Sequence, residues 1–99
     1  MSYRVRYTRA AREDLLRLYG FLLEKDIDAA RRALRAITNA TELLQEFPFT
    51  CRKALEDNPF LRELVIPFGA GGYVALFEID DNETVTILAV RHQREDDYH

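Results

Sequence analysis

The spacing of apolar residues changes twice along the chain, and these changes limit the folds that the sequence can adopt. Residues 3–7 alternate apolar and charged side chains, a pattern that is typical of a half-buried strand. Apolar residues then recur three and four positions apart in two runs, 9–24 and about 26–47, as they do in amphipathic helices. From Phe60 onward the period returns to two. The sequence therefore predicts the order β-α-α-β-β-β.

Polar residues and a proline mark the ends of the two predicted helices. Thr8 can cap the first helix, because its side-chain oxygen accepts from an unpaired backbone N–H group, and the second helix is expected to start near Asp26 or Asp28. Pro48 cannot continue a helix and marks the end of the second one. The second helix carries alanines at positions 29, 30, 33, 36 and 40. Such small side chains let two helices approach closely, so we expect an antiparallel helical hairpin.

Three strands are expected in the second half of the chain. They span residues 61–66, 73–79 and 84–90. Pro67 is predicted to stop the first of them, the glycine-rich segment 68–72 to form a flexible turn, and residues 80–83 to form a hairpin turn. One strand, a helical pair and an antiparallel meander predict a single α+β domain over residues 1–99, with both helices on one face of the sheet.

The composition is that of a small globular domain. The chain has 99 residues, of which 47% are hydrophobic and 31% are charged, so disorder is not expected. No apolar stretch is long enough to span a bilayer, and the charged N-terminus does not resemble a secretory signal, so we expect a cytoplasmic protein. The single cysteine, Cys51, excludes an internal disulfide and a cysteine-cluster zinc site. No cofactor and no metal ion are expected.

The net charge of −3 is unevenly distributed along the chain. Residues 1–35 have a balance of +4, whereas residues 36–99 have a balance of −7. Because proteins that hold a nucleic-acid backbone cluster many lysines and arginines, sequence-independent binding of nucleic acid is disfavoured. The arginine-rich first third has two interpretations, a solvated helix face or a face that meets an acidic partner segment.

Sequence motifs for catalysis are nearly absent. Residues 69–72 lack the lysine and hydroxyl residue of a phosphate-binding loop and precede a predicted strand. His92 and His99 lack the spacing of a helical metal pair. The polar tail, residues 91–99, holds two arginines, two histidines and a tyrosine. Such a set is compatible with acid/base chemistry at a phosphate, with a polar protein-binding edge, or with a solvated terminus.

These segments together resemble the ParE/RelE superfamily of bacterial type II toxin–antitoxin toxins. Residues 8–15, TRAAREDL, are similar to the start T-x-x-A-x-x-D-L of that family. The resemblance covers almost the whole chain, and its further segments are residues 43–48, 61–64, 73–78 and 86–95. It implies the family fold, a helical hairpin on a curved antiparallel sheet.

The superfamily divides by target, and the resemblance is stronger to the ParE-like branch. RelE-like members are ribosome-dependent mRNA endonucleases, whereas ParE-like members share the fold and poison DNA gyrase. The family strand pattern Tyr-Arg-hydrophobic-hydrophobic-Tyr-Arg has lost both arginines here, where Val74 and Glu78 stand. Loss of cations and gain of a carboxylate near a phosphate oppose cleavage. The resemblance therefore implies a gyrase inhibitor that is not an enzyme, with a ParD-like antitoxin as its partner.

The resemblance also supplies candidate residues. For gyrase poisoning they are the tail residues Arg91, His92, Arg94 and Glu95. For antitoxin binding they lie along the first helix, at Arg9, Arg12, Leu16, Tyr19 and Leu23. The alternative RelE-like nuclease would use Arg62, Arg91, Arg94 and Tyr98 around the phosphate. A further alternative is an attenuated, non-toxic homologue that still binds its antitoxin.

Overall fold

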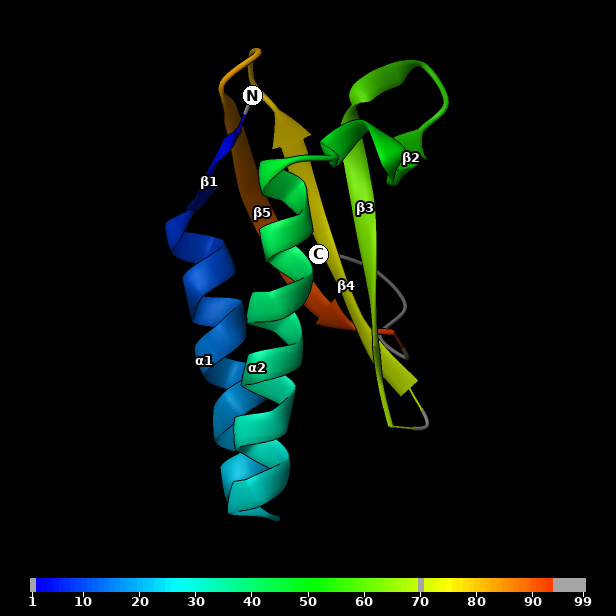
Figure 1. The fold of residues 1–99 in the computed structure, drawn as a ribbon. Coiled ribbons are helices and arrows are strands. Elements are labelled where there is room, and N and C mark those ends of the chain that lie inside the picture. Colours follow the sequence, from blue (N-terminus) through cyan, green and yellow to red (C-terminus); the bar gives the residue numbers. More distant parts are fainter. Residues whose placement is uncertain (1, 70, 94–99) are drawn as a thin grey trace.

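The computed structural model describes residues 2–69 and 71–93. Two helices and five strands follow one another along the chain, with two short 3-10 turns, η1 and η2, between the helices and the main sheet (Figure 1). Their bounds are β1 Arg4–Tyr7, α1 Arg9–Leu23, α2 Ile27–Glu42, η1 Leu43–Gln45, η2 Pro48–Thr50, β2 Arg52–Leu55, β3 Asn58–Phe68, β4 Gly71–Ile79 and β5 Thr84–His92. The predicted α+β class and the helical hairpin are confirmed.

The five strands form one mixed sheet in the order β1-β5-β4-β3-β2. The expectation of a wholly antiparallel sheet is wrong for β1, which pairs in parallel with β5, with Val5 opposite Val85. The cause is the path of the chain. The helical hairpin returns the chain to the end at which β1 starts, and β3, β4 and β5 then alternate in direction, so β5 runs the same way as β1 (Figure 1).

Several predicted boundaries differ from the structure. The second helix ends at Glu42 rather than near residue 47, and its last part tightens into η1. The strand expected at residues 61–66 runs from Asn58 to Phe68. Pro67 does not stop it, because β2 pairs only with the first half of β3 and leaves the second half at an edge where a missing N–H is tolerated. The four-residue strand β2 was not expected.

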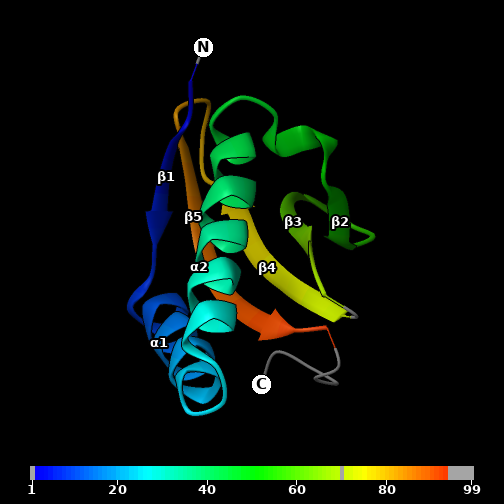
Figure 2. The ribbon, with the colours of Figure 1, turned by 60° about the horizontal axis from the view of Figure 1, so that its bottom comes forward.

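Both helices cover the same face of the curved sheet (Figure 1 and Figure 2). The core between these layers contains Leu18 of α1, Ile37 of α2, and Phe77 and Ile87 of the sheet, all of them buried. Ala30 and Ala33 are also buried, at 0% and 3% exposure. The predicted close approach of the helices therefore rests on these small side chains.

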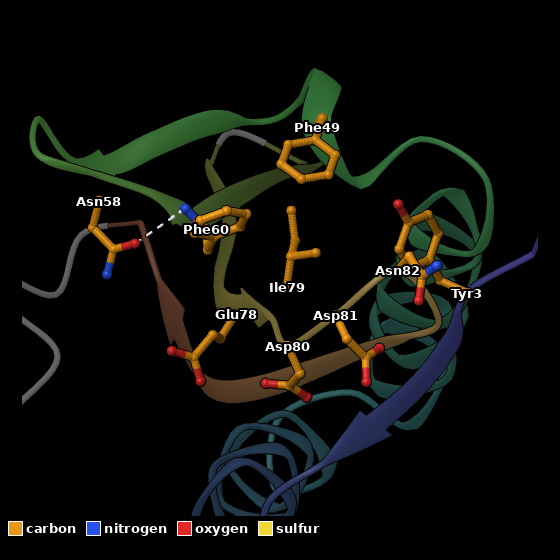
Figure 3. Close-up of a pocket in the computed structure, with 9 residues that line it drawn as sticks. All are labelled: Tyr3, Phe49, Asn58, Phe60, Glu78, Ile79, Asp80, Asp81 and Asn82. Carbon is orange, nitrogen blue, oxygen red and sulfur yellow. Dashed lines mark hydrogen bonds between the residues drawn. The ribbon is translucent and has the colours of Figure 1, made fainter.

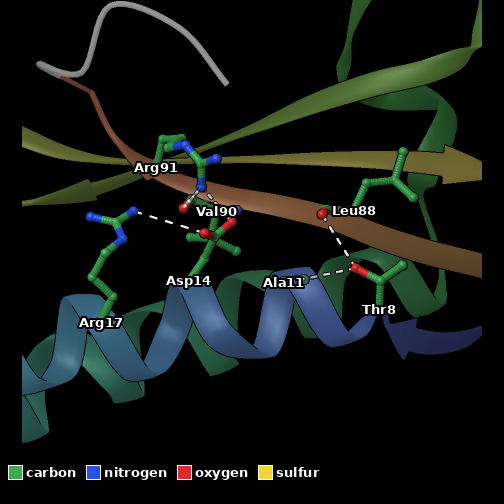
Figure 4. Close-up of polar contacts among 7 residues, drawn as sticks. All are labelled: Thr8, Ala11, Asp14, Arg17, Leu88, Val90 and Arg91. Carbon is green, nitrogen blue, oxygen red and sulfur yellow. Dashed lines mark hydrogen bonds and ion pairs between the residues drawn. The ribbon is translucent and has the colours of Figure 1, made fainter. Parts of the chain in front are cut away.

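Helix α1 takes the place of a neighbouring strand along part of β5. Strand β1 pairs only with residues up to Ile87, so the next backbone groups of β5 need other partners. The hydroxyl of Thr8 donates to the carbonyl of Leu88 (3.3 Å) and accepts from the N–H of Ala11 (3.0 Å), which confirms the predicted cap. One carboxylate oxygen of Asp14 accepts from the N–H of Val90 (2.9 Å; Figure 4).

Asp14 also forms the most enclosed ion pair in the described part of the chain. The same oxygen lies 2.5 Å from Nη1 of Arg91, and the two side chains are only 14% and 15% exposed. Arg17 approaches the other carboxylate oxygen at 3.9 Å (Figure 4). The carboxylate of Asp14 thus joins the backbone and a side chain of β5 to the middle of α1.

We expect Asp14→Ala to lower the free energy of unfolding by about 3 kcal/mol, because it removes the carboxylate that accepts from the N–H of Val90 and that pairs with the charge of Arg91. Asp14→Asn keeps an oxygen acceptor for the N–H and should lose roughly half as much. Urea unfolding followed by circular dichroism measures both. The exposed control Glu24→Gln should change stability by less than about 0.5 kcal/mol. Equal losses in the alanine variant and the control would contradict this role.

Candidate functional site

An apolar groove of about 480 Å³ lies between the second half of α1 and the end of β5. We call it the β5-end groove, and its lining includes Arg17, Leu18, Phe21, Phe68, Tyr73 and His92. The ring of Tyr73 contacts two other rings of the groove. Tyr73 lies between Phe68 and His92, with ring centroids 6.0 Å and 5.6 Å away. The groove therefore combines a broad apolar surface with the cationic side chain of Arg17 at its border.

The gyrase-poisoning candidates begin at this groove. His92 is a lining residue, and Arg91, the preceding residue of β5, is half-buried in the ion pair with Asp14. Arg94 and Glu95 lie outside the described residues. The described part of this candidate set thus lies beside the apolar groove. The positive charge of Arg91, however, is already paired with the carboxylate of Asp14 in the same chain.

The antitoxin-binding candidates lie on one stripe of α1, since they follow each other at intervals of three and four residues. Leu16 is 71% exposed and Leu23 is 39% exposed, whereas Tyr19 is half-buried in a narrow seam between the helices that Leu34 of α2 also lines. Arg12 is exposed. Arg9 is exposed too and forms an ion pair with Glu13, one helical turn further along.

The apolar part of this stripe continues onto α2. Ile27 is 57% exposed and Leu34 is 41% exposed. The sequence signal for this extension was weak, because core and surface leucines follow the same helical spacing. We call the combined surface of Leu16, Tyr19, Leu23, Ile27 and Leu34 the hairpin surface. An exposed apolar area of this kind is typical of a protein-binding surface.

The alternative nuclease residues are not gathered at one place among the described residues. Arg62 on β3 pairs opposite Phe77, whereas Arg91 on β5 pairs opposite Val74, so strand β4 and three residues of its length separate them. Arg94 and Tyr98 lie outside the described residues.

The guanidinium of Arg62 is bound to backbone carbonyls. It donates to the carbonyls of Pro59 (2.6 Å), Cys51 (2.7 Å) and Phe49 (3.2 Å). It also lies over the ring of Phe49, 5.3 Å from the centroid. These contacts hold η2 and the ends of β2 and β3 together, which is a structural role for Arg62.

Two side chains have pKa values that burial alters. Burial raises the pKa of the Cys51 thiol, an effect that the charge of Arg62 partly offsets. Burial also raises the pKa of the Tyr73 phenol above its usual value of 10.0. Both groups are therefore held in their protonated forms near neutral pH, in which neither is an activated nucleophile or base.

Within residues 2–69 and 71–93, no three His, Cys, Asp or Glu side chains gather in a way that would hold a metal ion. In the same part of the chain, neither helix is long and apolar enough to cross a membrane.

Comparisons with known proteins connect this chain to bacterial toxins. The family model described as the ParE toxin of the type II toxin-antitoxin system parDE matches residues 5–97. A protein named Toxin RelE3, from Caulobacter vibrioides, is 34% identical over 85 residues, which cover 86% of this chain and 88% of that protein. A solved structure described as the chromosomal ParDE TA system from P. aeruginosa has a similar fold, with a TM-score of 0.71 and 20% identity, covering 92% of this chain and 96% of that chain.

We expect alkaline pH to destabilise the protein through Tyr73. Because burial raises the phenol pKa in the folded state, the unfolded chain loses this proton first, and stability falls as the pH rises through 10.0. Tyr73→Phe removes this contribution. Urea unfolding at pH 8 and pH 10.5 should show the wild type losing more stability than the variant between the two values. An identical loss in both proteins would show that the phenol does not contribute.

Proposed function

The chain belongs to the ParE toxin family of type II toxin–antitoxin systems, and on this premise we propose that it arrests growth by binding DNA gyrase in the bacterial cytoplasm. In this proposal the chain inhibits by contact and breaks no covalent bond itself. A ParD-like antitoxin would neutralise it. The observation that carries the proposal is that Arg91 and Arg62 are both already bound by groups of this chain.

Cleavage of a phosphodiester needs cations that are available to the negative charge developing on the phosphate. Here the carboxylate of Asp14 already offsets Arg91, and three backbone carbonyls already bind Arg62. An RNA phosphate at Arg91 would have to compete with a carboxylate that also accepts from the backbone of β5. This competition favours inhibition by binding over cleavage.

The β5-end groove suits a protein target. Its aromatic rings and the flanking Arg17 and His92 combine apolar area with polar groups, which is the composition of many protein interfaces. We propose that His92 contacts gyrase at this groove, with Phe21 and Phe68 supplying apolar contact, and that Arg91, Arg94 and Glu95 also contact gyrase.

The hairpin surface suits the antitoxin. It offers an exposed apolar stripe on both helices, bordered on α1 by Arg9 and Arg12. An acidic segment that is disordered when free can order on such a surface and bury its own apolar residues there. The structural neighbour from P. aeruginosa is described as a ParDE system, which supports a ParD-like protein as the partner.

A RelE-like nuclease is the second candidate, because the relative from C. vibrioides carries the name RelE3. It would act on ribosome-bound mRNA through Arg62, Arg91, Arg94 and Tyr98. The two mechanisms differ in their products, since gyrase poisoning leaves cleaved plasmid and reduced supercoiling, whereas the nuclease leaves shortened mRNA.

Two tail residues separate these mechanisms, because Glu95 belongs only to the gyrase candidates and Tyr98 only to the nuclease set. We expect Glu95→Ala to weaken inhibition of purified gyrase about fivefold or more in a supercoiling assay, and Tyr98→Phe to leave it unchanged. Thermal unfolding of both variants controls for folding. Ribosome-bound mRNA that is cut by the wild type but not by Tyr98→Phe, with supercoiling unaffected, would establish the nuclease instead.

Leu16→Glu tests the hairpin surface. Leu16 is 71% exposed, so the new carboxylate stays hydrated in the free toxin, but the complex would bury it against an acidic partner. We expect affinity for the ParD-like antitoxin to fall about tenfold or more in calorimetric titrations. The matched control is Leu55→Glu on β2, where the leucine is 53% exposed. Equal losses of affinity in the two variants would rule out this site.

A further inference from the structure

A second groove, of about 600 Å³, lies at the end of the sheet opposite the β5-end groove. Its walls come from the start of the chain, from η2, from the start of β3, and from the end of β4 with the connection that follows it. We call it the acidic groove and define it by six residues, Tyr3, Phe49, Phe60, Glu78, Asp80 and Asp81.

One side of the acidic groove is aromatic and exposed. The side chains of Phe49 and Phe60 are 47% and 51% exposed, and their rings make an edge contact with centroids 6.1 Å apart. Ile79 lies between these rings and the carboxylates of the other side (Figure 3). Because apolar surface in water is unfavourable, this side favours a ligand that covers it.

The other side carries three carboxylates that have no cationic partner in the described structure. Glu78, Asp80 and Asp81 are all exposed, and within residues 2–69 and 71–93 no lysine, arginine or histidine forms an ion pair with any of them. The hydroxyl of Thr86 donates to Asp80, and backbone N–H groups of the following turn donate to Asp81. Glu78 thus has the carboxylate most available to a ligand.

We propose that the acidic groove binds an arginine-bearing segment of a partner protein. The methylene groups of an arginine would pack on Phe49 and Phe60 while its guanidinium reaches Glu78 and Asp80. Arginine fits better than lysine, because a planar guanidinium stacks on a ring and also bonds a carboxylate at two points. Phe49 already has one such contact, with Arg62.

The charge of the groove selects among partners. A nucleic acid would bring its phosphates against three carboxylates, which is repulsive. The antitoxin segment proposed above is acidic and belongs to the hairpin surface, which comes from α1 and α2. Because neither helix contributes to the acidic groove, its occupancy does not depend on the gyrase and antitoxin proposals.

The test uses the full chain, labelled with ¹⁵N, and the peptide acetyl-Gly-Arg-Gly-Arg-Gly-amide. Titration followed by NMR should shift the amide signals of Phe60 and residues 78–82, and added salt should weaken binding. Replacing both arginines of the peptide by lysine should weaken binding about threefold, and replacing them by glutamate should abolish it. Glu78→Gln in the protein should weaken arginine-peptide binding about threefold to tenfold.

Two further variants keep the proposal falsifiable. Glu78→Gln combined with Asp80→Asn removes both charges but leaves an acceptor for Thr86, so it should abolish binding while the protein stays folded. Glu24→Gln removes an exposed carboxylate from the end of α1 and should leave the affinity unchanged. Unaltered affinity in the double variant would overturn the proposal. A dimer that forms with rising concentration and is lost in the double variant would overturn it too, because the occupant would then be a second copy of this chain.

Discussion

The stretch of β5 that β1 does not cover is the constraint on which the arrangement of this molecule depends. Strand β5 has nine residues, but its neighbour β1 has only four, so backbone groups beyond Ile87 require another source of hydrogen bonds. Thr8 and Asp14 supply them from α1. This attachment fixes the rotation of α1 about its own axis. One flank then faces β5, another packs on α2, and the stripe that contains Leu16 is left to solvent.

Local features of the fold could be predicted from the sequence, whereas long-range ones could not. The cap at Thr8 involves a partner only three residues away and forms as predicted, and the second helix begins beside Asp26, one of its two predicted starts. The role of Asp14 depends on Val90, which is 76 positions distant, and no periodicity encodes that contact. The parallel direction of β1 likewise follows from the path of the whole chain. The short strand β2 could not be predicted, because four residues are too few to show a clear alternation of apolar and polar side chains.

The candidate sites show the same division. A helical stripe of apolar residues on α1 could be drawn from spacing alone, but its extension to Ile27 and Leu34 required the two helices to be placed side by side. The arginine-rich first third of the sequence allowed two interpretations, a solvated helix face or a face that meets an acidic partner segment. Only the fold shows that Glu78 and Phe60 line the same groove, since these residues belong to different strands. The sequence suggested Arg62 as a phosphate ligand. In the structure its guanidinium instead donates to backbone carbonyls and so joins the start of β3 to the residue before β2.

The attachment of α1 along β5 also affects whether copies of this chain associate through their sheets at high concentration. Sheets of different molecules join into fibrils through long, flat edge strands whose backbone N–H and C=O groups have no partner strand. Here each outermost strand has only four residues, β1 carries the charges of Arg4 and Arg6, and Pro67 removes a donor from the part of β3 that β2 leaves uncovered. The sheet therefore offers few free backbone hydrogen-bonding groups to which a further strand could add. This protects a small β-rich protein from polymerising through its sheet.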